Sequence, residues 1–190
     1  MATATRKTAT TARKTPAKST KASTSAAAQE ATTLLRADHK RVSALFEQYE
    51  GTRSAAKKKT IVSTICHELS VHAQIEEEIF YPAVKAALKD KEMVPEATVE
   101  HATLKELIAQ VKDKEPDGEM FDAKIKVMSE YVKHHVKEEQ NEMFPKAKKT
   151  RLDMNALGAQ MAARKEELLA SPELLDAPPV PASPAMAATT

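Results

Sequence analysis

Apolar side chains recur every three or four residues through the middle of the chain, which is the spacing of amphipathic helices. This spacing runs through residues 35–49, 61–79, 94–111 and 121–139. Gly51 and the Pro116-Asp117-Gly118 turn signal lie between such segments. Four amphipathic helices with short connections predict an all-α fold, an antiparallel up-down-up-down four-helix bundle. A fifth amphipathic stretch at about 152–169 is expected to pack outside the bundle as an extra C-terminal helix.

The buried stripe of each predicted bundle helix includes one histidine: His39, His72, His101 and His135. The second and fourth helices add an acid one turn later, Glu76 after His72 and Glu139 after His135. Side chains at i and i+4 lie on one face of a helix, so each pair can reach the same ion. A lone buried histidine is usually a core residue with satisfied nitrogens, but six polar groups in one layer are costly to bury without a shared partner. The pattern therefore predicts a metal-binding layer.

The two halves of the predicted bundle repeat each other. Asp38-His39 corresponds to Glu100-His101 at an offset of 62 residues, and His72, Glu76 and Pro82 correspond to His135, Glu139 and Pro145 at an offset of 63. The equal distance to the proline selects His135 and Glu139 over the neighbouring pair at 134 and 138. His134 and His67 are therefore assigned to helix flanks. Each proline removes a backbone donor late in its helix and is expected to kink or end it.

Imidazole and carboxylate ligands without a thiolate suit iron, manganese or zinc, and bundle-core sites of this kind commonly hold two metals bridged by carboxylates. Two six-coordinate ions have about 12 coordination positions. Four histidines, two bridging glutamates and a bridging oxide or hydroxide fill about ten of them. About two positions stay open for water or a small ligand, which is a feature of reactive rather than structural sites.

Tyr131 precedes His135 by one turn, and the repeat places it at the position equivalent to Glu68. Both residues are expected near the metals. Tyr131 either ligates an open position or hydrogen-bonds to bound oxygen, or it is an ordinary core tyrosine with a bonded hydroxyl. Glu68 either partners a ligand histidine or is a charge at the boundary of the core.

The formal net charge of +2 over 190 residues hides an uneven distribution. Residues 1–29 carry six basic and no acidic side chains, so the rest of the chain, with 23 basic and 27 acidic residues, has a charge of −4. This first segment has almost no large apolar side chain and is expected to be a disordered basic Ala/Thr/Lys-rich tail. Five of the ten prolines fall in 171–190, which predicts a second disordered tail, rich in Pro and Ala. Between the tails we expect a bundle over 30–150 and a C-terminal helix over 151–170.

Composition also limits the class of protein. Three glycines are too few for a turn-rich β fold, and no apolar run approaches the ~18 to 20 residues that span a bilayer. The N-terminus lacks a secretory-type apolar stretch and Cys66 is the single cysteine, so a cytoplasmic location is expected. The basic tail is a solvated arm, a targeting segment or a non-specific nucleic-acid contact, and the last of these would add nucleoid association. It has no aromatic side chain for base stacking, so sequence-specific reading is not expected.

The order His…His-x-x-x-Glu…His…His-x-x-x-Glu resembles that of the hemerythrin-like HHE cation-binding family. The segments that carry the resemblance are ADHKRVSALF, HAQIEEEIFYP, EHATLKELI and HHVKEEQNEMFP, and it covers about 34–148. Two positions depart from the oxygen-carrying hemerythrins. Lys105 stands where those proteins have a second histidine in the third helix, and Gln140 stands where they have an aspartate ligand, whose role Glu139 takes. The chain thus resembles the branch with four histidines and two glutamates.

The resemblance implies two non-haem iron ions as the cofactor, ahead of manganese or zinc, with Glu76 and Glu139 as bridges. It also implies a small diatomic or peroxide ligand, because family members are associated with dioxygen, nitric oxide or peroxide chemistry and with iron or redox sensing. Two classes of function stay open. One is an oxidoreductase such as a peroxidase that turns over peroxide or nitric oxide. The other is a non-enzymatic iron or redox sensor or metal buffer, tethered to nucleic acid by the basic tail. No membrane partner is expected, and the oligomeric state is left open.

Overall fold

The computed structural model describes Met1 and residues 29–171, and within these residues the chain is helical and forms no strand. The elements are α1 (Ala31–Glu50), α2 (Ala55–Ile75), the π-helical turn η1 (Glu76–Phe80), α3 (Tyr81–Leu88), α4 (Met93–Val111), α5 (Gly118–Glu138), the π-helical turn η2 (Glu139–Met143), α6 (Phe144–Lys148) and α7 (Met154–Ala170). The two predicted tails, apart from their innermost residues, lie outside the described part of the chain.

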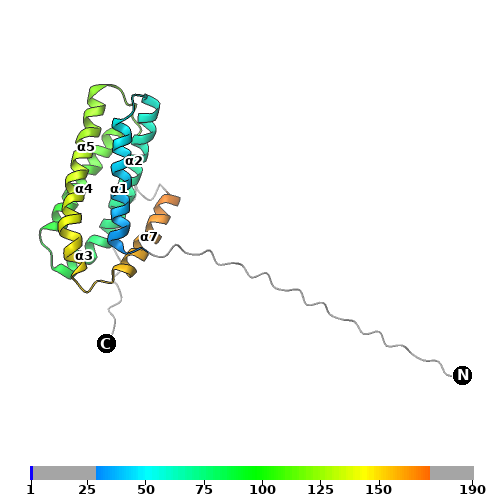
Figure 1. Ribbon diagram of the computed structural model, residues 1–190, viewed down its shortest axis with the longest axis vertical. Coiled ribbons are helices and arrows are strands. Elements are labelled where there is room, and N and C mark those ends of the chain that lie inside the picture. Colours follow the sequence, from blue (N-terminus) through cyan, green and yellow to red (C-terminus); the bar gives the residue numbers. More distant parts are fainter. Residues whose placement is uncertain (2–28, 172–190) are drawn as a thin grey trace.

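Four long helical rods lie side by side in Figure 1, and they are α1, α2 with its continuation through η1 and α3, α4, and α5 with its continuation through η2 and α6. α1 packs against α2, α2 against α4, α4 against α5, and α5 returns to α1. This order of neighbours is that of an up-down-up-down bundle, so the predicted fold is confirmed.

The core is divided by a polar layer. One apolar cluster includes Leu35, Ile75, Phe80 and Phe144, and the second includes Val42, Phe46, Ile65 and Met128. His39 lies on α1 between Leu35 of the first cluster and Val42 of the second. The four predicted histidines and both glutamates are buried at this level, with 6% or less of each residue exposed. The packing therefore buries these six polar side chains between two apolar clusters.

Each proline was expected to kink or end its helix, and the helical runs continue through both prolines with a local departure from α-helical geometry rather than an end. A π turn precedes Pro82 and another precedes Pro145, and each turn begins at a predicted ligand, Glu76 or Glu139. The backbone carbonyl of Glu76 accepts a hydrogen bond from the amide of Tyr81, five residues later, and Glu139 accepts one from Phe144 in the same way. Widening the turn accommodates the proline ring, which would meet the carbonyl four residues earlier in a regular α-helix.

The fifth helix, α7, lies against one side of the bundle, as predicted, beside the lower part of α1 (Figure 1). The Asp153 side chain accepts hydrogen bonds from the amides of Asn155 and Ala156 at 3.0 Å and so caps its first turn. Leu157, Met161 and Leu168 are buried against α1, α2 and η1. α7 thus closes an apolar face of the bundle that would otherwise meet solvent.

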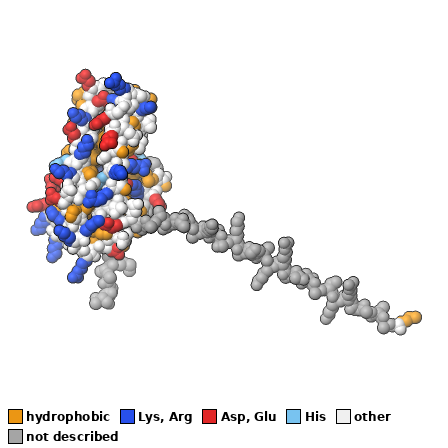
Figure 2. All heavy atoms as spheres, viewed as in Figure 1, with side chains coloured by type: hydrophobic (Ala, Val, Ile, Leu, Met, Phe, Trp, Pro, Cys, Tyr) orange, Lys and Arg blue, Asp and Glu red, His pale blue; other side chains and the backbone are white. Residues whose placement is uncertain are grey.

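Charged side chains of both signs are interspersed over the face of the helical body shown in Figure 2. No helix among the described residues is long and apolar enough to cross a membrane.

Candidate metal centre

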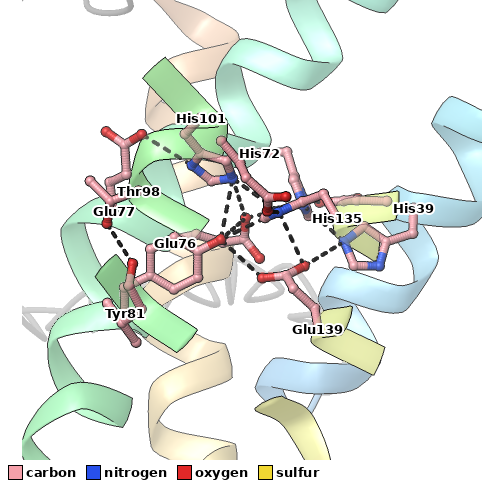
Figure 3. Close-up of polar contacts among 12 residues, drawn as sticks. His39, His72, Glu76, Glu77, Tyr81, Thr98, His101, His135 and Glu139 are labelled. Carbon is pink, nitrogen blue, oxygen red and sulfur yellow. Dashed lines mark hydrogen bonds and ion pairs between the residues drawn. The ribbon is translucent and has the colours of Figure 1, made fainter. Parts of the chain in front are cut away.

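Four imidazole rings, one from each long helical rod, turn their Nε2 atoms toward one another in the polar layer (Figure 3). Nε2 of His39 lies 3.0 Å from Nε2 of His72. Nε2 of His101 lies 3.1 Å from Nε2 of His135. Two nitrogen ligands held at right angles about 2.1 Å from one ion lie ~3.0 Å apart. The rings therefore form two pairs, each with the spacing of two ligands to a common ion.

Each glutamate reaches both histidine pairs. Oε2 of Glu76 lies 3.2 Å from Nε2 of His72 and 3.5 Å from Nε2 of His101. Oε2 of Glu139 lies 3.2 Å from Nε2 of His39 and 3.6 Å from Nε2 of His135. These are positions from which a carboxylate can bridge two ions.

The outward-facing Nδ1 of each ring meets a second polar side chain. Glu77 Oε1 lies 3.1 Å from Nδ1 of His101, Glu100 Oε2 lies 2.6 Å from Nδ1 of His135, Gln140 Nε2 lies 2.9 Å from Nδ1 of His39, and Asp38 Oδ2 lies 3.6 Å from Nδ1 of His72. The last distance is that of an ion pair rather than a hydrogen bond. The carboxylates orient their rings and increase the basicity of the inward nitrogen, whereas the Gln140 amide donates to Nδ1 of His39 and only orients that ring.

The polar groups of the layer do not satisfy one another fully, and a bound metal would satisfy those that remain. Oε1 of Glu76 and Oε2 of Glu139 are buried and have no hydrogen-bond partner among the described residues. Ligand atoms of His39, His72, Glu76 and Glu139 lie within 4.8 Å of one another, as do those of Glu76, His101 and His135. Two overlapping sets that share Glu76 match a pair of cations with a common carboxylate.

Residues 30–147 match the family model described as the hemerythrin HHE cation-binding domain. The chain belongs to this family. The HHE domain is similar in fold to the crystal structure of a hemerythrin HHE cation-binding domain-containing protein from Mycobacterium kansasii, with a TM-score of 0.65 and 22% identity over 77% of this chain and 91% of that one. The chain is also 27% identical to a DNA nickase from Nostoc sp. over 111 residues, and these residues make up 58% of this chain. The match spans only 31% of the nickase.

Electrostatics in the HHE domain favour a shared proton or a cation between the two carboxylates. Burial raises the pKa of Glu76 well above its usual value, and the charge of Glu139 adds to the rise. Burial acts in the same direction on Glu139, but the positive charges of neighbouring histidines, His135 first, lower its pKa. Burial also lowers the pKa of His72 to about 4. Its neutral form is the one that binds metal.

Tyr81 is part of the layer although only the family motif pointed to its segment. Its hydroxyl donates to Oε1 of Glu139 at 3.0 Å and lies 3.2 Å from Nε2 of His101. At an offset of 63 residues Tyr81 corresponds to Phe144. The Phe144 ring stacks on His39, with centroids 6.0 Å apart and planes 6° apart. The signal that could have identified this pair is an aromatic residue directly before each of the two repeated prolines.

Other residues singled out in the sequence lie around the layer. Tyr131 is half-buried on α5 and takes no part in the polar contacts described for the layer, so its role stays a prediction. Glu68 pairs with Arg41, 2.8 Å away, rather than with a ligand histidine. Lys105 pairs with Glu77 at 2.7 Å, and Arg36 donates to Oε1 of Gln140 at 2.7 Å. Lys105 and Gln140, the two residues that differ from the oxygen-carrying hemerythrins, therefore contact groups next to the predicted ligands.

A small cavity of about 20 Å³ adjoins all four histidines. Its other walls are largely aliphatic, with Val42, Leu69, Leu104 and Val132 among them. One water occupies ~10 to 15 Å³ by this measure, so the cavity has room for one or two water-sized molecules. A cavity of this size excludes larger organic compounds.

Proposed function

We propose that the HHE domain holds two non-haem irons and binds or reacts with a small oxidant (dioxygen, nitric oxide or peroxide) at an open iron position. The observation that carries the proposal is the pair of glutamates, each within 3.6 Å of both histidine pairs, beside a cavity that admits only small molecules. The donor set of imidazole and carboxylate suits iron, manganese or zinc, and the resemblance to hemerythrin-like proteins puts iron ahead of the other two.

In this proposal His39 and His72 would hold one iron, His101 and His135 would hold the other, and the two glutamates would serve both. When bound, reduced iron would supply the electrons that a small oxidant accepts. The protein side chains provide the rest of the environment. Aliphatic walls exclude bulk water from the cavity, and the Tyr81 hydroxyl, which donates to Glu139, supplies a hydrogen-bond donor inside the layer.

Metal analysis and an absorption spectrum of the purified full chain test this proposal. We expect two irons per chain and an oxo-to-iron charge-transfer band. The double variant His72→Ala/His135→Ala removes one imidazole from each pair and should lose both irons and the band. His67→Ala, on the flank of α2, is the matched control and should retain them. A double variant that still carries two irons with the native spectrum would refute the ligand assignment.

Turnover separates the two classes of function. An oxidoreductase such as a peroxidase consumes peroxide or nitric oxide in excess of the protein when a reductant is supplied. A non-enzymatic iron or redox sensor or metal buffer takes up one ligand or one metal pair per site and then stops. Stopped-flow absorption with one and with fifty equivalents of peroxide distinguishes these outcomes.

A second candidate function is that of a non-enzymatic protein that also binds nucleic acid. Two observations favour this function. A stretch of 111 residues of this chain is similar to part of a DNA nickase. The N-terminal tail of the protein, which is predicted to be cytoplasmic, carries six basic residues. We propose a non-specific contact to DNA, which would place the protein at the nucleoid. Replacing the six basic residues of 1–29 by glutamine in the full chain should weaken DNA retention and reduce its salt dependence. Retention that is unchanged in this variant would exclude the tail as the contact.

A further inference from the structure

The internal repeat places equivalent helix faces on opposite sides of the metal layer, and the two faces differ in chemistry. On the first face Leu34, Val71 and Ile75 pack in the apolar cluster that contains Met161 of α7. The equivalent residues on the second face are Glu96, His134 and Glu138, at the same offsets of 62 and 63. α7 covers the first face, whereas no described helix covers the second. One side of the layer is therefore closed and the other is polar and open.

A cavity of about 70 Å³ lies on the open face between α4 and the α5–η2 run. Four glutamates line it, Glu96, Glu100, Glu138 and Glu142, and its lining extends to His135 and Glu139 of the metal layer. Lys146 lies 3.6 Å from Glu142 at this cavity. The cavity is thus strongly acidic and joins the protein surface to two ligands of the centre.

Glu100, His134 and Glu138 present ligand atoms within 4.8 Å of one another, and two of them, Glu100 and Glu138, line this cavity. Nε2 of His134 lies 3.2 Å from Oε1 of Glu138 and 3.9 Å from Oε1 of Glu100. The second oxygen of Glu100 lies 2.6 Å from Nδ1 of His135. One carboxylate therefore touches both this cluster and a ligand ring of the centre.

The cavity also adjoins a ligand of the metal centre. Glu139 lines it, is 1% exposed, and has an Oε2 atom without a hydrogen-bond partner among the described residues. The carboxylates along the cavity therefore range from the exposed Glu142 to the buried Glu139. Divalent cations bind such oxygens, and an imidazole among them favours transition metals.

We propose that Glu100, His134 and Glu138 form an outer divalent-cation site, from which metal passes through the acidic cavity to the centre. The proposal rests on the metal centre described above. The outer site binds cations weakly, because the side chains of His134 and Glu138 are 60% and 39% exposed and so are partly hydrated. Its effect is on rate, since an acidic cleft concentrates cations and accelerates their entry.

Stopped-flow uptake of Co²⁺ by the metal-free full chain tests the proposal. The double variant His134→Gln/Glu138→Gln should retain the same Co²⁺ per chain after gel filtration but load it roughly tenfold more slowly at low salt. Glu130→Gln removes one carboxylate from the same helix outside the cavity and should load at the native rate. Raising the ionic strength should narrow the difference between native and double-variant rates. A double variant that loads at the native rate at low salt would overturn the proposal.

Crystals soaked in Mn²⁺ provide a second measurement that does not depend on the centre. An anomalous peak among Glu100, His134 and Glu138 supports the outer site, and its absence at millimolar Mn²⁺ counts against it. A native chain that retains no Co²⁺ would instead refute the two-metal centre, and the anomalous signal alone would then decide on the outer site.

Discussion

Gly158 is the residue at which α7 comes closest to the start of α1, and replacing it with alanine tests how this helix docks. An added Cβ would lie 2.0 Å from the carbonyl oxygen of Gln29 and 2.7 Å from the amide nitrogen of Ala31. Both obstacles are backbone atoms, which cannot rotate away as the end of a flexible side chain can. Gly158→Ala therefore forces α7 to move away from α1.

The cost of that movement is limited by what α7 buries. Leu157, Met161 and Leu168 are 9%, 0% and 0% exposed, and burying such a side chain contributes about 1.5 to 3 kcal/mol. Complete undocking would cost roughly 5 to 9 kcal/mol, whereas overpacking relieved by a local shift costs about 1 to 3 kcal/mol. The cheaper response prevails, and because the obstacle is backbone we expect a loss near the upper limit, about 2 to 3 kcal/mol.

Urea unfolding of the full chain, followed by far-UV circular dichroism, measures this loss, and the other two glycines supply controls. Gly51 has its nearest obstacle at 3.4 Å and a φ of −76°, so Gly51→Ala should change stability by less than about 1 kcal/mol. Gly118 has a φ of +78° and no atom within 4 Å of the added Cβ, so Gly118→Ala should cost about 1 to 2 kcal/mol through backbone strain alone. A Gly158→Ala chain as stable as the Gly51→Ala chain would refute the close docking of α7.

Three further predictions concern the metal layer. Lys165→Met leaves the buried Asp38 carboxylate without its ammonium partner. Urea unfolding should therefore show a free energy of unfolding lower by about 3 kcal/mol. The control Lys40→Met, at an exposed position, should change it by less than about 0.5 kcal/mol. The raised pKa of Glu76 means that this carboxyl holds its proton to a higher pH than an ordinary carboxyl, and a cation that binds below that pKa must displace the proton. Metal affinity should therefore be lost as pH falls through that pKa, by roughly tenfold per pH unit for each displaced proton. Calorimetry in two buffers of different ionisation enthalpy counts the protons released, and a count of zero would contradict the pKa shift. Tyr81→Phe removes the hydroxyl 3.0 Å from Oε1 of Glu139 and should cost about 1 kcal/mol in the same urea assay; unchanged stability would mean that the hydroxyl is not needed to satisfy Glu139.

The four long helices and the six side chains of the layer could be predicted because local rules determine them. The three- and four-residue spacing defines each buried stripe, and the i, i+4 spacing places Glu76 beside His72. The repeat then selects the register of the second half. None of these inferences needs a contact between distant parts of the chain.

Tyr81 was not predicted because it enters the layer through a departure from α-helical geometry. At about 100° per residue, a residue five positions after Glu76 lies ~140° away around a regular helix. The π turn from Glu76 to Phe80 inserts extra backbone and brings Tyr81 back to the side of the ligands. The pattern of apolar and polar residues indicates period, but it does not indicate where a proline makes the helix widen instead of ending.

The residues that lie over each side of the metal layer could not be predicted from the sequence either, because they depend on where α7 docks. The ligands follow the two-fold repeat closely, yet their surroundings do not. On the His39 side Phe144 stacks on the ring and α7 closes the face behind His72. On the His101 side a tyrosine hydroxyl reaches the layer, and an acidic cavity extends outward from His135. Two cations in this layer would therefore have equal ligands but unequal access to solvent. A metal ion exchanges with solvent only where solvent can reach it, and it is retained where packed side chains exclude solvent. A layer with equivalent ligands on its two sides but different surrounding residues can therefore hold one ion firmly while the other exchanges.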